Sequence, residues 1–490
     1  MKELEKLVQI VTKRHQKSAP LLNFSEKKPG KELVLFKAYQ QGKSTTTGNN
    51  KKGPDSAELR MTRARLRKKL LNHLYFLNFT DPFLKVSYRY EQECLGMLHQ
   101  ARILLKEGEH QISERLLRNA LRIAEDCEFT GHAISIIEQL RFLYAQTGEG
   151  AKFKKISKNL PHYLELLKYE QEAEGIYYAA KLEINRSVSA KKKYLPVMPE
   201  NIERLKQLWE KYKSFGVFEA YYKTNVWYQE LTNNFTNIVK ITLEAEKMLQ
   251  SKKINPKRFD DRYNKYINVY AHLRDKQFTK GLAFAAKAIG SFNRSSNNWF
   301  AFMENYFLLA MHAGNYHAAA DLMDDVYNNP FMPKINRVAQ ERWQLYRAYL
   351  YFIYPDASLK RPFSYQSFIM AVPEYSKDKQ GFNVAILILQ YLHYLKMKEA
   401  EALLYRIESL RKYAGRHLKD VVSLRTQYFF KLLMLVVKED MSPAKVRRKG
   451  RALADKMADT PPPGDAYAEI EIIPYEVLWE HILRILQEKK

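Results

Sequence analysis

The sequence predicts an all-α protein, a right-handed α-solenoid of about nine helical hairpins. Turn signals recur about every 41 residues, with a mainly apolar helical stretch before each turn and an amphipathic stretch after it. Such a repeat is typical of stacked hairpins, which bury their apolar faces against their neighbours. Gly and Pro are scarce, at 18 each among 490 residues, which suits long helices with short connections. The turn signals are Gly108, Gly148, Ala190-Lys191, Asn233-Asn234, Asp275, Gly314, Pro355-Asp356, Lys396 and Glu439-Asp440.

Residues 1–85 do not follow this rhythm and are predicted to form a basic helical N-terminal module. Apolar residues at helical spacing indicate short helices at Glu3–Lys13 and Glu32–Gln41. The segment 41–54 is rich in Gly, Ser, Thr, Asn and Lys, and this composition predicts a mobile loop.

A strongly basic helix is predicted from Ala57 to about Leu77, with an N-cap at Asp55-Ser56. Clustered cations neutralise phosphates or acidic groups, so this helix is the candidate contact surface for an anion. Its polar face holds the candidate anion-binding residues Arg60, Arg63, Arg67 and Lys68, and its narrower apolar stripe holds Leu66, Leu70, Leu74 and Leu77.

The repeat array is predicted over residues 86–458, and its clearest unit surrounds Gly314. Trp299–Met311 is apolar on nearly all sides, as expected for a helix packed between two others. After the turn, Tyr316 and Ala319 begin an apolar stripe on the second helix. Residues 459–490 are predicted to be a Pro-rich linker and a capping helix around 475–487, which closes the end of the array.

The segment from Asn305 to Val326 resembles the helix-turn-helix centre of a tetratricopeptide repeat. The match lies in Gly314, Tyr316 and Ala319, and Leu95-Gly96 resembles the Leu-Gly pair of a first helix. The family repeat is roughly 34 residues, so a period near 41 is a departure toward the HEAT range. The resemblance implies a superhelix with a concave groove that holds peptides or partner domains.

No pattern in the sequence indicates catalysis, so the chain is not expected to be an enzyme or to bind a cofactor or metal. Gln41-Gly42-Lys43-Ser44 lacks the earlier glycine and the preceding strand of a phosphate-binding loop. His312 and His317 flank a turn without further metal ligands. Cys94 and Cys127 have no neighbouring His arrangement that would activate a nucleophile.

Aromatic residues are abundant and favour either inter-helix packing or contact with a ligand. The best groove candidates occur where polar residues interrupt the aromatic ones. These partner-binding candidates are Tyr221, Tyr222, Lys223 and Asn225.

The formal charge of +27, of which about +12 falls in the first 75 residues, favours anionic partners. The primary hypothesis is a non-catalytic cytoplasmic scaffold, adaptor or regulator that binds a protein or peptide in the groove of the array. The alternative is a nucleic-acid-binding or nucleoprotein-associated protein that uses the basic module. No apolar run reaches the ~18 residues of a membrane span. The sequence defines neither the oligomeric state nor the identity of the partner.

Overall fold

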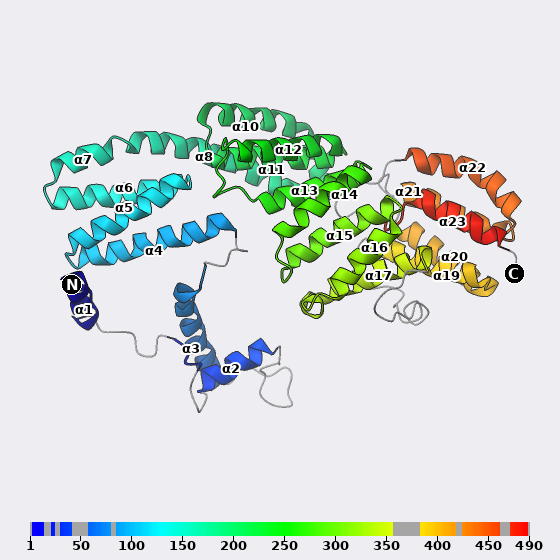
Figure 1. The fold of residues 1–490 in the computed structure, drawn as a ribbon, viewed down its shortest axis with the longest axis horizontal. Coiled ribbons are helices and arrows are strands. Elements are labelled where there is room, and N and C mark those ends of the chain that lie inside the picture. Colours follow the sequence, from blue (N-terminus) through cyan, green and yellow to red (C-terminus); the bar gives the residue numbers. More distant parts are fainter. Residues whose placement is uncertain are drawn as a thin grey trace. The chain divides into compact units, whose positions relative to one another are not determined.

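The structure, a computed structural model, describes residues 2–13, 21–24, 30–41, 57–79, 85–355, 383–417, 424–460 and 471–488. It divides into two compact units, Met1–Leu167 and Lys168–Lys490, and Figure 1 shows the helices of both. Every regular element in the described ranges is helical, which confirms the predicted all-α class. The finer division with boundaries at 85 and 458 stays a prediction. Residues 42–54 of the predicted loop and the three prolines of the predicted linker lie outside the described residues.

In the first unit, short N-terminal helices precede a series of helices joined by tight turns. From α4 to α7 each helix packs against the next one along the chain. Their buried side chains, including Cys94, Leu117 and Ile137, form one core. The elements are α1 (Lys2–Lys13), α2 (Lys31–Gln40), α3 (Ala57–His73), the 3-10 helix η1 (Leu74–Phe76), α4 (Val86–Lys106), α5 (His110–Asp126), α6 (Thr130–Gln146) and α7 (Gly150–Ser157).

The second unit continues the same construction, and the unit boundary lies within α8. Neighbouring helices pack in chain order from α10 to α17 and again from α19 to α23. The elements are α8 (Leu160–Arg186), α9 (Val188–Tyr194), η2 (Leu195–Val197), α10 (Met198–Tyr212), α11 (Phe215–Leu231), α12 (Phe235–Gln250), α13 (Asp261–Arg274), α14 (Phe278–Ala288), η3 (Ile289–Ser291), α15 (Asn297–His312), α16 (Tyr316–Tyr327), η4 (Met332–Lys334), α17 (Arg337–Ile353), α19 (Asn383–Met397), α20 (Ala400–His417), α21 (Leu424–Lys438), α22 (Pro443–Asp459) and α23 (Tyr475–Gln487).

The turns share one local geometry, which explains the rhythm of the sequence. At the turn between α4 and α5, Gly108 has a φ of 81° and the N–H of Glu109 donates to the carbonyl of Leu104 at 2.9 Å. This bond ends the helix, and the residue that follows its cap is left-handed, a conformation that glycine adopts without strain. Six further predicted turns have a left-handed residue at the predicted position or within two residues of it: Gly148, Asn233, Lys276, Gly314, Lys398 and Asp440.

The turn predicted at Ala190-Lys191 is wrong. Both residues lie within α9, which begins after Ser187. The Ser187 hydroxyl accepts a hydrogen bond from the N–H of Ala190 at 3.1 Å, so this serine caps a new helix. The chain therefore breaks before the predicted loop.

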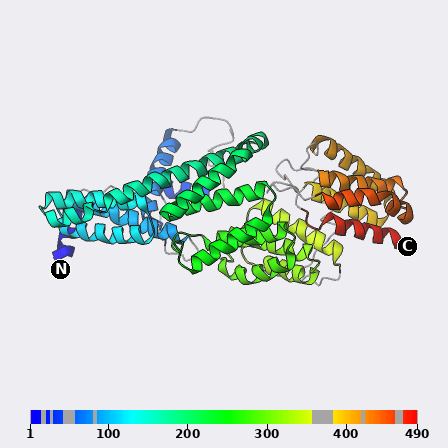
Figure 2. The same ribbon diagram turned by 90° about the horizontal axis from the view of Figure 1, so that it is seen from above.

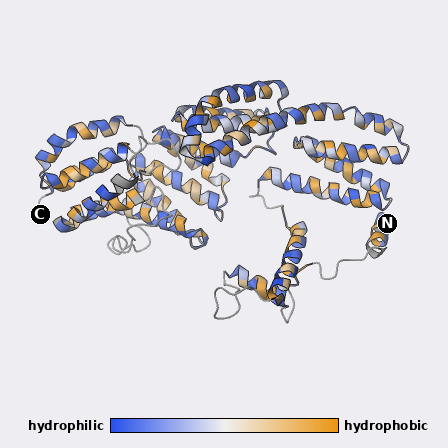
Figure 3. Cartoon of the chain, turned by 180° about the vertical axis from the view of Figure 1, so that it is seen from behind, coloured by the Kyte–Doolittle hydropathy of each residue, from blue (hydrophilic) through white to orange (hydrophobic). Residues whose placement is uncertain are grey.

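α15 belongs to the largest hydrophobic core among the described residues, as its apolar sequence predicts. Trp299, Phe302 and Phe307 are each at most 1% exposed. α14 approaches α15 closely because Gly281 has no side chain: a Cβ at that position would lie 2.8 Å from Cδ2 of Leu309. Hydrophobic and hydrophilic residues alternate along the amphipathic helices in Figure 3.

The terminal helix α23 forms at the predicted residues and packs against α22 and α19 (Figure 2). Arg425, 3% exposed, joins it to α21 through ion pairs at 2.5 Å with Glu471 and Glu476. The aromatic rings of Phe429 and Tyr475 stack beside these ion pairs, with centroids 4.4 Å apart. A buried charge requires such partners, so the ion pairs fix the C-terminal segment in place.

Candidate functional site

The basic helix α3 rests on a small apolar cluster. Leu66 is buried in a cluster with Leu22 and Leu35, which both precede α3 in the sequence. The Nε2 atom of His73, in the last turn of α3, accepts a hydrogen bond from the N–H of Leu22 at 2.8 Å. With these contacts, one side of α3 packs against α2 and the other side faces solvent (Figure 1).

The predicted anion-binding residues lie mainly on the solvent side of α3. Arg60, Arg67 and Lys68 are exposed, and Arg63 is partly buried. The helix carries six cations and one acid, Glu58. That acid forms an ion pair with Lys31 of α2, which lowers the pKa of the carboxyl. The remaining charge of α3 is therefore almost wholly positive.

The prediction that the helix and its apolar stripe continue to Leu77 is wrong beyond the end of α3. The α-helix ends at His73 and a 3-10 turn follows. A 3-10 helix has about three residues per turn, so the helical spacing of the stripe is not continued. Leu74 is 54% exposed, Leu77 is 52% exposed and Tyr75 is 79% exposed, and Leu70, within α3 itself, is 37% exposed.

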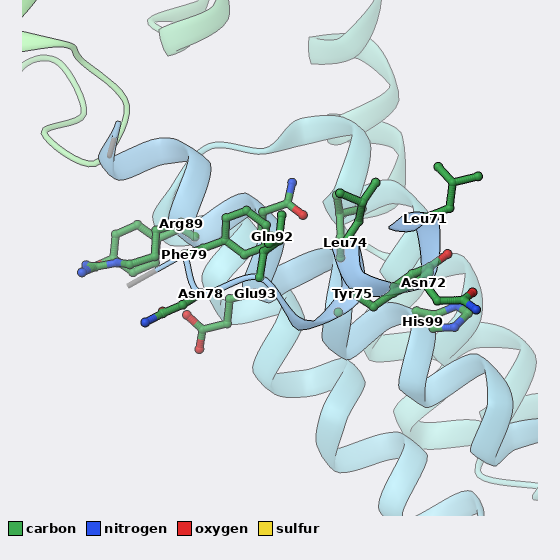
Figure 4. Close-up of a pocket in the computed structure, with 14 residues that line it drawn as sticks. Leu71, Asn72, Leu74, Tyr75, Asn78, Phe79, Arg89, Gln92, Glu93 and His99 are labelled. Carbon is green, nitrogen blue, oxygen red and sulfur yellow. The ribbon is translucent and has the colours of Figure 1, made fainter. Parts of the chain in front are cut away.

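These exposed side chains line a cavity of about 1150 Å³ between η1 and α4 (Figure 4). Leu74, Tyr75 and Phe79 belong to one wall, and residues of α4, among them His99, belong to the other. The rings of Tyr75 and His99 are stacked, with centroids 6.2 Å apart. The walls are thus mostly apolar and aromatic, with polar groups such as Arg89 among them.

Gly96 of α4 belongs to the same cavity, and a Cβ added there would have no other atom within 4 Å. Its neighbour Leu95 is 37% exposed and also lines the cavity. The Leu-Gly pair that resembles the tetratricopeptide first helix therefore faces open space in this protein.

Of the groove candidates on α11, Tyr222 is a core residue. It is 3% exposed, and its hydroxyl donates to Oδ1 of Asn264 at 2.7 Å. Burial holds the pKa of Tyr222 well above the ordinary tyrosine value. The predicted contact of Tyr222 with a partner is wrong, because neighbouring helices cover the side chain.

The other three α11 candidates are at least partly accessible. Burial raises the pKa of Tyr221. Lys223 pairs with Glu219 at 2.7 Å, and the amide oxygen of Asn225 accepts from Gln229 at 3.1 Å. These bonds connect residues one helical turn apart on α11 and leave the three side chains as part of a mixed polar and aromatic surface.

A row of tyrosines lies on α13, and the sequence reasoning missed it. Tyr263, Tyr266 and Tyr270 are half-buried and follow one another at intervals of three and four residues. Burial raises the pKa of all three. The hydroxyl of Tyr270 donates to Oε1 of Glu230 on α11 at 3.0 Å. The helical spacing of the three tyrosines was the available signal, because it places them on one face.

A cavity of about 340 Å³ opens beside these tyrosines, between the first turns of α13 and α15. Tyr263, Tyr266 and Phe292 supply aromatic surface, and Asp260 and Asn298 supply polar groups. A cavity with aromatic walls and a few polar groups suits a single side chain of a bound polypeptide.

One turn further along α15, Glu304 lies 3.2 Å from Nε of Arg342 on α17, with 15% of its side chain exposed. Burial raises the pKa of Glu304 to about 7, and the opposing effect of Arg342 does not restore the ordinary value. The charge of Glu304 also contributes to the raised pKa of Tyr266. We call Tyr263, Tyr266, Tyr270, Glu304 and Arg342 the tyrosine face.

The described residues contain no group of three or more His, Cys, Asp or Glu side chains that could hold a metal ion. Cys94 is buried, and burial raises the pKa of its thiol to about 11, so it is a poor nucleophile at neutral pH. His312 is bound through Nε2 to the carbonyl of Glu471 at 2.6 Å, and burial lowers its pKa to about 4. Across the same described ranges, no helix combines the length and apolar character that a bilayer crossing requires.

Comparisons of this chain with protein-family models, with curated proteins and with solved structures give no match. The function is therefore argued from the residues of the chain alone.

Proposed function

We propose that the chain is a non-catalytic cytoplasmic scaffold or adaptor that binds a protein or peptide on the tyrosine face. The proposal includes the arrangement predicted from the sequence, a tetratricopeptide-like right-handed solenoid of about nine hairpins, in which first helices such as α11, α13 and α15 line the concave side. No cofactor or metal is part of this function.

The observation that carries the proposal is the cavity of about 340 Å³ beside Tyr263 and Tyr266. Tyrosines give large contact areas at a small cost in side-chain entropy, and they are enriched where proteins bind one another. The nearby Glu304–Arg342 pair and Asn298 supply charges, donors and acceptors for a peptide backbone or polar side chains.

The test is selection of a random peptide library on the full-length chain, followed by affinity measurements on the enriched peptides. Tyr266→Phe and Tyr263→Ala should weaken binding, by about threefold and about tenfold, because they remove a hydroxyl and an aromatic wall. Tyr405→Ala, at an exposed tyrosine of α20, is the matched control. Equal affinities for all four proteins would contradict the proposal, as would turnover of a substrate by the purified chain.

A second candidate function is nucleic-acid contact through α3, which its excess of cations favours. Each phosphate contact with a single strand should contribute about −0.7 to the slope of log affinity against log salt. Binding of RNA and heparin to the full chain and to a chain without residues 1–85 tests this alternative. No binding at ~50 mM salt, together with no effect of the deletion, would rule it out.

A further inference from the structure

The cavity between η1 and α4 and the basic surface of α3 belong to the first unit. The tyrosine face belongs to the second unit. We propose that this cavity is a second interaction site, which binds an amphipathic helix of a partner protein that carries large apolar residues flanked by acidic residues. The proposal goes beyond the proposed function, since none of its residues belongs to the tyrosine face.

The size and lining of the cavity suit a helix with large apolar side chains. A volume of about 1150 Å³ lies above the range of roughly 300–1,000 Å³ that is typical of small-molecule pockets. Its walls include Leu71, Leu74 and Tyr75 from the end of α3 and η1, and Leu95 from α4. Each of these four side chains is more than a third exposed. Large apolar side chains that gather in the open are typical of protein interaction sites, and a hydrophobic groove suits the apolar face of a helix.

The charge beside the cavity is positive and favours an acidic ligand. Arg67 and Lys68 precede Leu71 by four and three residues on α3, so they lie one helical turn from the wall of the cavity. The only acid of α3, Glu58, forms its ion pair with Lys31 at the other end of the helix. The α4 wall adds Arg89 and the acid Glu93, whose opposite charges offset each other, so the excess of positive charge belongs to α3. A helix that inserts apolar side chains into the cavity passes this cationic rim, and acidic residues on that helix complement the rim.

The leucine side chains of the walls favour a polypeptide over an anionic lipid surface or an RNA strand. A bilayer surface is flat on the scale of this cavity. The bases of an RNA strand can stack on Tyr75 and His99, but RNA has no aliphatic side chains to pack against Leu71, Leu74 and Leu95. An α-helix with its side chains is roughly 10 Å across and can extend two or three side chains into the hollow.

Gly96 provides a way to block the cavity without disturbing the fold. A Cβ at this position meets no atom within 4 Å, so Gly96→Leu extends into the hollow rather than into the core. Gly175 on α8 is also an exposed helical glycine with no atom within 4 Å of an added Cβ. Gly175→Leu is therefore the matched control for the chemical change alone.

The probe is a displayed library of helical peptides in which Glu occupies the polar positions. The positions i, i+3, i+4 and i+7 vary among Leu, Ile, Phe and Trp. A second library has Lys in place of Glu. Both libraries are selected on the full-length chain at ~50 mM salt, and the enriched peptides are titrated by fluorescence anisotropy. Vesicles of phosphatidylcholine with phosphatidylserine and a single-stranded RNA are titrated in parallel.

We expect enrichment from the Glu library and not from the Lys library. Gly96→Leu should weaken the enriched peptides at least tenfold and Gly175→Leu should leave them unchanged. Arg67→Glu with Lys68→Glu should weaken them about tenfold at ~50 mM salt and less at ~500 mM, because salt screens exposed charges. The matched charge control is Arg447→Glu with Arg448→Glu on α22. Circular dichroism checks that each variant keeps its helical content.

Three outcomes would overturn the inference. The first is equal enrichment from the two libraries. The second is unchanged peptide affinity in Gly96→Leu. The third is binding of vesicles or RNA that depends on Arg67 and Lys68 while no peptide is enriched, which would make the surface purely electrostatic. Tyr266→Phe separates this site from the tyrosine face, because it should not alter these titrations.

Discussion

Substitution of Gly281 by alanine tests the packing that positions the tyrosine face, because α14 packs between α13 and α15. The new Cβ would lie 2.8 Å from Cδ2 of Leu309 and 2.9 Å from Cβ of His272, closer than van der Waals contact allows. Overpacking of this kind costs about 1–3 kcal/mol. Replacement of glycine by alanine within a helix stabilises the helix by about 0.5–1 kcal/mol, so the net loss of stability should be about 1–2 kcal/mol.

The assay is hydrogen exchange of the α13–α15 amides in the full chain, which reports local stability. Global unfolding is less suitable because a chain with two units need not unfold in a single two-state transition. A loss of about 1.4 kcal/mol corresponds to a tenfold fall in protection. Gly175→Ala is the control, since its Cβ meets no atom within 4 Å and should stabilise α8 by about 0.5–1 kcal/mol. If Gly281→Ala increases the protection of the α13–α15 amides, as Gly175→Ala is expected to do for the amides of α8, the packing described for α14 is wrong.

Three further predictions concern single side chains. The pKa of Glu304 is raised to about 7 in the folded state, so the fold holds a proton there that the unfolded chain releases near pH 4–5. Stability should therefore fall by up to about 3 kcal/mol from pH 5 to pH 8, and Glu304→Gln should flatten that dependence; an unchanged pH profile of thermal unfolding would contradict this. Arg425→Ala leaves Glu471 without its partner in a largely buried position and should destabilise α23 by about 3–5 kcal/mol, measured as loss of hydrogen-exchange protection in α23 alone. Tyr222→Phe removes the 2.7 Å bond to Asn264 and should destabilise the second unit by about 1–3 kcal/mol in urea unfolding, whereas no change would mean that water reaches Asn264.

The turns could be predicted because their geometry is local. A left-handed residue after a helix favours glycine or asparagine, and Gly108, Gly148, Asn233 and Gly314 stand at those positions. The helical class followed from spacing for the same reason. The turn predicted at Ala190-Lys191 was wrong because Ser187 starts a helix three residues earlier, a capping signal that the periodicity did not include.

The candidate sites depend on contacts between distant residues, and the sequence contains no local signal for those contacts. Tyr222 is buried in the core between helices, and Asn264, 42 residues later, accepts the hydrogen bond of its hydroxyl. Glu304 meets Arg342 from another helix. Leu74 is exposed on the 3-10 turn after His73, although its spacing from Leu70 suggested an apolar stripe. In contrast, the cationic character of α3 is a property of composition, and it could be predicted directly.

Binding of a polypeptide on the tyrosine face is tested most directly by hydrogen exchange of the full-length chain with and without a peptide selected from a random library. We expect added protection in α13, α15 and the N-terminal turns that surround the cavity beside Tyr263, and no such effect from the same peptide on the Tyr263→Ala variant. A bound peptide that leaves the exchange of α13 and α15 unchanged would show that the tyrosine face is not the binding site.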